Sequence, residues 1–226
     1  MRGRLGLTLA LAAVAGAGLL AAQSGGSASR LTGRVPAAAL PAIDSIIATA
    51  VAESLPSEPL VQKALEGGAK GIPADRLVNG VRLVLLQLRD ARILVARAVP
   101  GQPVPEGHVA AVAAALARGL PAPIVARLLT IAPNESPGPV LHAAADLVAH
   151  RFNPDSAADL LVDAHNKGLR GVRLLDVAVA ADHELQRGGG RTPSDALARV
   201  HAMLPNVPAP EAGVTRRGTK GSYQRP

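Results

Sequence analysis

The feature that most constrains the fold is a regular spacing of prolines in the second half of the chain. The prolines that set this spacing follow one another at intervals of 16, 16 and 17 residues, at Pro105, Pro121, Pro137 and Pro154. One more step of 16 lands on Arg170, and Pro193 stands after a longer gap. Proline is favoured at the first position of a helix, where its missing N–H leaves no hydrogen bond unmade. The spacing therefore predicts the starts of six successive helices.

Apolar residues keep the same phase as the prolines. At offset four they are Val109, Val125, Leu141, Ala158, Leu174 and Leu197, and at offset seven Val112, Leu128, Ala144, Leu161, Val177 and Val200. Offsets of four and seven place side chains on one face of a helix. We therefore predict six short helices of about 11 to 15 residues, joined by tight turns.

A longer helix is predicted upstream, from Ala74 to about Ala98, ending before Pro100. Its main apolar stripe consists of Leu77, Val78, Val81, Val84, Leu85, Leu88, Ala91 and Val95. A second apolar set lies off this stripe and consists of Leu83, Leu86, Ile93 and Leu94. A helix that is apolar on more than one side is usually packed on more than one side. We expect it at the centre, flanked by the N-terminal helices and the first phased helices.

The sequence predicts an all-α protein. The apolar residues recur at helical spacing, and aromatic residues make up only 1% of the chain, so Ala, Val, Leu and Ile must form the core. The expected architecture is short helical hairpins, with helices repeating about every 16 residues, packed on one long central helix. Both a solenoid-like stack and a compact bundle fit this pattern. The predicted segments are a signal peptide (1–28), a linker (29–40), an all-helical domain (41–204, with N-terminal helices in 41–100 and phased hairpins in 101–204) and a disordered basic tail (205–226).

The N-terminal segment has the pattern of an export signal. Arg2 and Arg4 precede an apolar run from Leu5 to Ala22, and small residues follow it. Cleavage after either Ala22 or Ala28 is consistent with this pattern. The alternative is a single membrane anchor, although about 18 residues are near the lower limit for spanning a bilayer. An exported chain without cysteine fits a bacterial protein better than a eukaryotic secretory one, so we predict export to a bacterial periplasm or extracellular space.

The positive charge lies mostly at the two ends of the chain. Six basic residues belong to the N-terminal segment and the tail, and removing them from the net charge of +7 leaves about +1 for the body. A nearly neutral body with one Phe has neither the field nor the stacking surface of a nucleic-acid-binding domain. We expect no nucleic-acid partner. We expect contact with a membrane only through an uncleaved N-terminus. The basic tail is expected to be solvated, with weak contact to an anionic surface as the alternative.

One histidine-bearing segment is a candidate metal site. His142, Asp146 and His150 are spaced four and four, so on one helix they lie on the same side, as zinc ligands do. Leu141 and Ala144 define the expected buried face of that helix, and the three polar residues point away from it. A solvated polar face is therefore the simpler interpretation.

Two further groups of residues contain side chains that are used in catalysis or phosphate binding. Asp163, His165, Asp182 and His183 contain the residue types of an acid–base pair, but no Ser or Thr stands in a nucleophile elbow. The segment 66–71 has the glycines and lysine of a phosphate loop in the wrong spacing, so we expect it to end a helix. The sequence therefore predicts no enzyme and no cofactor.

The run Leu60–Pro73, with Lys63, Leu65, Glu66 and Lys70, resembles helical exported proteins of unknown function from bacteria. The resemblance implies an exported helical protein and assigns no functional residue. We therefore expect a non-enzymatic helical-repeat scaffold or binding protein of the cell envelope. The alternatives are an envelope protein that binds a metal or hydrolyses a substrate through the His and Asp residues of its repeat helices, and a membrane-tethered protein with an uncleaved N-terminus.

Overall fold

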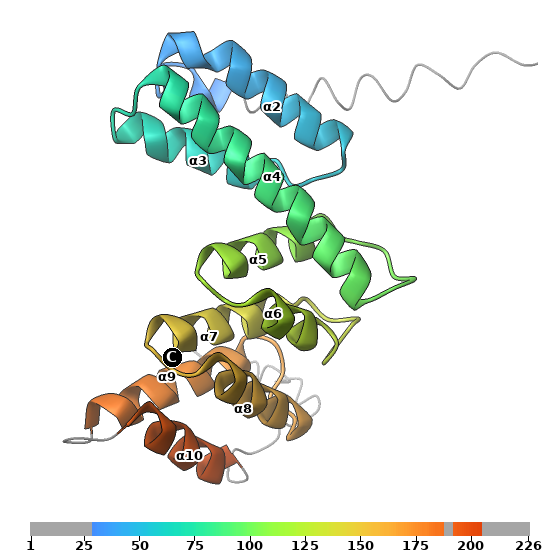
Figure 1. Ribbon diagram of the computed structural model, residues 1–226, viewed down its shortest axis with the longest axis vertical. Coiled ribbons are helices and arrows are strands. Elements are labelled where there is room, and N and C mark those ends of the chain that lie inside the picture. Colours follow the sequence, from blue (N-terminus) through green and yellow to red (C-terminus); the bar gives the residue numbers. More distant parts are fainter. Residues whose placement is uncertain (1–28, 188–191, 205–226) are drawn as a thin grey trace, which may run out of the picture. The chain divides into compact units, whose positions relative to one another are not determined.

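The computed structural model describes residues 29–187 and 192–204, and within these ranges every regular element is a helix (Figure 1). The all-α prediction is confirmed. The predicted signal peptide and basic tail lie outside the described residues. The chain divides into two compact units, residues 1–138 and 139–226. None of the described helices is long and apolar enough to cross a membrane.

The first unit is built around α4 (Ala74–Ala98), whose bounds coincide with the predicted long helix. The elements that pack against α4 are the short 3-10 helix η1 (Ala37–Ala39), α2 (Leu40–Ala52), α3 (Glu58–Ala69), α5 (Glu106–Ala117) and α6 (Ala122–Leu129). A helix of this length extends for about 37 Å, which gives room for partners at both ends. The predicted central position of α4 is therefore confirmed.

The burial of α4 is one-sided, contrary to the expectation that both of its apolar sets are packed. The buried residues are Leu77, Val81, Leu85, Leu88, Ala91 and Val95, all from the predicted main stripe. From the second set, Leu83, Leu86 and Ile93 remain 56%, 47% and 49% exposed. The described neighbours of α4 cover only the main stripe, so these three side chains face solvent.

Residues 29–40, predicted as a linker, are packed into the first unit. Residues 29–31 are helical, and Leu31 and Ala39 are fully buried. Arg30 donates two hydrogen bonds to the carboxylate of Glu58 at the start of α3, at 2.7 and 2.8 Å. Because apolar side chains anchor this segment, it is part of the folded unit and not a spacer.

The phased apolar positions of the second half are all buried, which confirms their predicted inward face. The helices that carry them are α5 and α6 in the first unit, then α7 (Gly138–Ala149), α8 (Pro154–Asn166), α9 (Arg173–Arg187) and α10 (Pro193–Met203). Helix α6 has only 8 residues, fewer than expected. Helix α9 begins three residues after Arg170, because Gly171, with φ of 53°, forms part of the preceding turn.

The phased helices are divided between the two units. Helices α5 and α6 pack on α4 in the first unit, whereas α8, α9 and α10 pack on one another in the second. The single predicted helical domain, 41–204, is thus two units. The boundary falls between Gly138 and Pro139, and not near residue 100 where the sequence indicated a change from long to phased helices.

Five turns share one hydrogen-bond pattern. A residue with positive φ is followed by an apolar residue whose N–H donates to the carbonyl five residues earlier, the Schellman arrangement. The pairs are Ser54–Leu55, Gly71–Ile72, Gly119–Leu120, Arg151–Phe152 and Gly168–Leu169. Glycine occupies the positive-φ position in three of these turns. The other two place Ser54 and Arg151 in a conformation that side chains rarely adopt.

Candidate functional site

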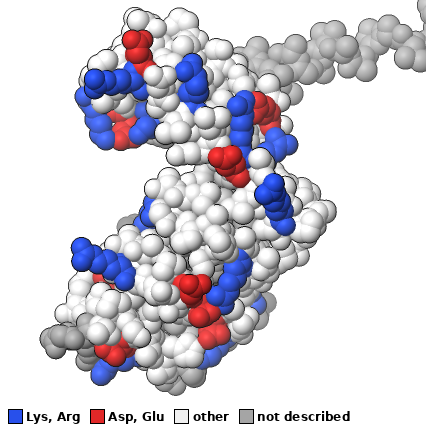
Figure 2. Space-filling model, viewed as in Figure 1, with Lys and Arg blue, Asp and Glu red and all other residues white. Residues whose placement is uncertain are grey.

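A groove opens in the first unit between α3 and α5, over the surface of α4. Its volume is about 470 Å³, and Figure 2 shows the molecular surface hollowed between these two helices. All three lining helices belong to the same compact unit. The groove is therefore built by the packing of α3 and α5 at two places along α4.

The α5 wall of the groove consists of alanines. Ala110, Ala113, Ala114 and Ala117 line it, and their spacing of three, one and three places them on one side of the helix. Ala114 and Ala117 are exposed, whereas Ala110 and Ala113 are half-buried. Side chains this small leave the helix backbone accessible to close approach by another chain.

The α3 wall is polar. Lys63 and Lys70 both pair with Glu66, and the Lys63 Nζ lies 3.3 Å from Glu66 Oε2. Hydrogen bonds from Lys70 and then Lys63 lower the pKa of the Glu66 carboxyl. The Gln62 amide on the same wall donates to Glu58 at 2.6 Å. Lys70 lies just beyond the lining residues, so at this end of α3 two ammonium groups surround one carboxylate and leave a small positive excess beside the groove.

The floor of the groove comes from the middle of α4. Leu88 is fully buried beneath it, Val84 is half-buried, and the Gln87 amide is exposed. The site thus combines an apolar floor, a small-residue wall and a polar wall. This pattern suits an amphipathic segment, with apolar side chains against α4 and α5 and polar ones toward α3.

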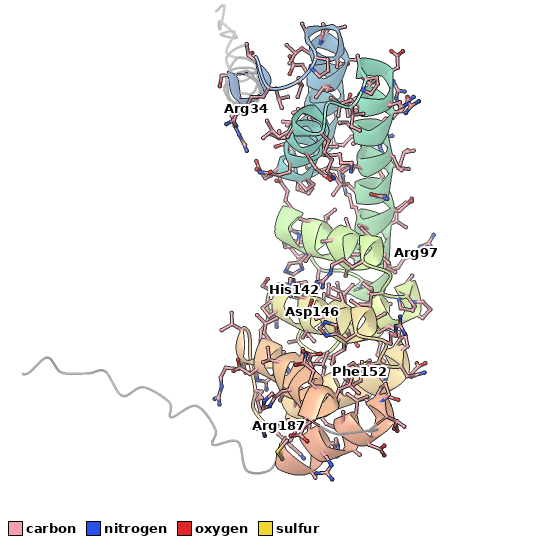
Figure 3. The ribbon with its side chains drawn as sticks, turned by 90° about the vertical axis from the view of Figure 1, so that its left-hand side faces the viewer. Arg34, Arg97, His142, Asp146, Phe152 and Arg187 are labelled. Carbon is pink, nitrogen blue, oxygen red and sulfur yellow. The ribbon has the colours of Figure 1, made fainter. Side chains whose placement is uncertain are left out.

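Two of the predicted metal candidates, His142 and Asp146, lie on α7 (Figure 3), and His150 directly follows its last residue. His142 Nε2 is 3.3 Å from Asp146 Oδ2, while His150 Nδ1 is 3.3 Å from Asp182 Oδ1 on α9. The structure therefore brings two of the three residues together and directs the third to another helix. Within the described ranges, no group of three His, Asp or Glu residues is placed to hold a metal ion.

The predicted acid–base constellation is divided among separate pairs. Asp163 Oδ2 lies 2.6 Å from His201 Nε2 of α10, and Asp182 pairs with His150 as above. His165 is 5% exposed, with its Nδ1 3.0 Å from the Arg170 guanidinium. His183 is exposed on α9. The four residues do not meet at one place, so they do not form a reaction centre together.

The glycine- and lysine-containing segment 66–71 closes α3, as predicted. Gly71 has φ of 64°, and its N–H donates to the carbonyl of Gly68 at 3.0 Å. Gly67 and Gly68 lie inside the helix, which runs to Ala69, and do not interrupt it. The Lys70 side chain pairs with Glu66, so the segment is a helix terminus tied by an ion pair.

Sequence reasoning did not identify the groove. Its one signal in the sequence is the alanine face of α5, which also fits an ordinary buried face. The position of the groove depends on how far apart α3 and α5 dock along α4, which is a tertiary property. Comparison of the chain with family models, curated proteins and solved structures gave no significant match. The resemblance of residues 60–73 to exported helical proteins stays a prediction.

Proposed function

We propose that the protein is an exported, non-enzymatic binding protein of the bacterial cell envelope, and that its first unit holds a helical segment of a partner protein. The groove between α3 and α5 is the observation that carries this proposal. An amphipathic helix placed there meets an apolar floor and an alanine wall, and its polar side faces α3. Helix-in-groove recognition depends on this division of apolar and polar surface.

The charge of the α3 wall favours an acidic polar face on the partner. Lys63 and Lys70 surround a single carboxylate, that of Glu66. Because these groups are exposed, the attraction adds selectivity and speed of association more than affinity. Most of the affinity must come from apolar side chains that bury against Val84, Leu88 and the α5 alanines.

The binding test uses labelled amphipathic peptides with a Leu/Ala face and either a Glu or a Lys polar face. We expect the Glu set to bind more tightly, measured by fluorescence anisotropy. Ala114→Arg places a long cation in the groove and is expected to weaken binding about tenfold, or ~1.4 kcal/mol. The matched control is Ala52→Arg, because Ala52 is exposed at the end of α2 and does not line the groove. Failure of every peptide to bind, or equal losses in both variants, would contradict the proposal.

Export is supported by the basic start, the apolar run and the small residues of the N-terminal segment, together with the absence of cysteine. The mass of the protein purified from its cells tests this part. Loss of the first 22 or 28 residues is the expected result. A full-length chain in the membrane fraction would favour the tethered alternative and contradict secretion.

A further inference from the structure

The second unit contains an apolar cavity that shares no lining residue with the groove of the first unit. It lies between α9 and α10 and has a volume of about 280 Å³. Val177 and Ala180 line it from α9, and Val200, Met203 and Leu204 line it from α10 and its end. Asp176 stands on the rim. Leu204, which also lines the cavity, is the last residue before the C-terminal segment 205–226.

The apolar surface continues beyond the cavity. Val172 and Val179 are 70% and 68% exposed, and Met203 is 45% exposed. Asp176 and Val179 are three residues apart on one side of α9, and Val172 lies in the turn just before the helix. Exposed valines beside a half-open apolar cavity form a surface that gains free energy when another chain covers it.

We propose that the cavity and the adjoining side of α9 are the docking site for the chain's own segment 205–217. This segment starts at the cavity wall and contains Pro205, Pro208 and Pro210, with Val207 between the first two. Prolines favour an extended chain, so less conformational entropy is lost on docking. Extended at about 3.1 Å per residue, residues 205–214 span about 31 Å, whereas α9 is about 22 Å long. The segment therefore reaches the full length of the helix.

Charge complementarity supports this occupant. The described residues of the second unit include eight Asp and Glu against six Lys and Arg. The 22 residues after Leu204 carry four basic residues and one acidic residue. Asp176, which lines the cavity, forms no ion pair with any residue in the described part of the chain. An external ligand would have to displace the segment to enter the cavity.

Because the chain has no cysteine, engineered disulfides give a direct test in the full-length protein. The test pair is Ala180→Cys with Val207→Cys. The control pair is Ala198→Cys with Val207→Cys, because Ala198 is exposed on α10 outside the cavity. Residue 207 is only three residues beyond Leu204, so an undocked segment reaches both positions. We expect the Ala180 pair to close several-fold faster, within monomers. Equal rates, or disulfide-linked dimers, would overturn intramolecular docking.

Oxidation of Met203 gives a second readout that leaves the cavity unchanged. Met203 is the only methionine besides Met1, so its conversion to the sulfoxide is read directly from peptide mass. Peroxide is expected to oxidise Met203 several-fold faster in a chain ending at Leu204 than in the full-length chain. Circular dichroism confirms that the shortened chain keeps its helices. An unchanged oxidation rate in that folded chain would overturn the proposal.

Discussion

Replacing Gly68 with alanine tests the packing of residues 29–40 against α3. A Cβ atom at Gly68 would lie 2.1 Å from the carbonyl oxygen of Arg34 and 3.1 Å from Val35 Cγ1. The first contact is with backbone, so the segment itself must move to relieve it. Its movement would disturb Leu31, which is fully buried, and Val35, which is 7% exposed. The substitution therefore sets a steric cost against the helix-forming advantage of alanine.

Two free-energy terms decide whether Gly68→Ala stabilises or destabilises the protein. Forcing an extra methyl group into a packed site costs about 1–3 kcal/mol, whereas alanine gains up to about 1 kcal/mol over glycine in a helix. We expect Gly68→Ala to destabilise the first unit by a net 1–2 kcal/mol, approximately. The matched control is Gly80→Ala within α4, where the nearest atom to the added Cβ is the Lys63 Cε at 3.8 Å. Only the propensity gain remains there, so this variant should be stabilised by about 0.5–1 kcal/mol.

Urea unfolding followed by far-ultraviolet circular dichroism measures both variants, because the chain has no tryptophan for fluorescence. The prediction is an opposite shift of the unfolding midpoint in Gly68→Ala and Gly80→Ala relative to the wild type. If both variants are stabilised equally, the backbone of Arg34 does not lie against α3. The account of residues 29–40 as part of the folded unit would then be wrong.

Three further substitutions test other contacts. Hydrogen bonds from Arg30 and, to a smaller extent, Gln62 lower the pKa of the Glu58 carboxyl to about 2. The ionised carboxylate therefore stabilises the fold fully above about pH 4.5, and this stabilisation is lost as pH falls toward 2. Because this pair is exposed, solvent screening keeps its contribution small; the urea midpoint should fall less between pH 4.5 and 2 in Arg30→Gln than in the wild type, and an equal fall would contradict this account. Phe152→Ala should cost about 3–5 kcal/mol and separate an early melting step of the second unit in calorimetry, whereas a single shifted transition would contradict independent units. Arg151→Gly should raise the free energy of unfolding by about 0.5–1 kcal/mol through relief of positive φ, seen as a higher urea midpoint, and a lower midpoint would contradict the turn geometry.

The long helix shows what sequence periodicity can and cannot predict. Its bounds and the buried residues from Leu77 to Val95 follow from local apolar spacing. The exposure of Leu83, Leu86 and Ile93 does not, because these residues are as apolar as the buried ones. Only the docked positions of neighbouring helices decide which apolar side of a helix is covered. The groove over α4 was missed for the same reason, since it is a space between helices that the local pattern of each helix does not describe.

Two of the turns form without glycine at the positive-φ position, and the energies of these turns explain how. Ser54 and Arg151 adopt φ of 53° and 66°, at a cost of about 1–2 kcal/mol for a side chain in that region. The next residues, Leu55 and Phe152, are only 1% and 2% exposed, and burying a side chain of this size contributes about 1.5–3 kcal/mol. The free energy gained by burying the side chain equals or exceeds the cost of the positive φ. The apolar residue that follows the positive φ is buried in four of the five turns and half-buried at Ile72, and glycine lowers the cost of the turn without being required.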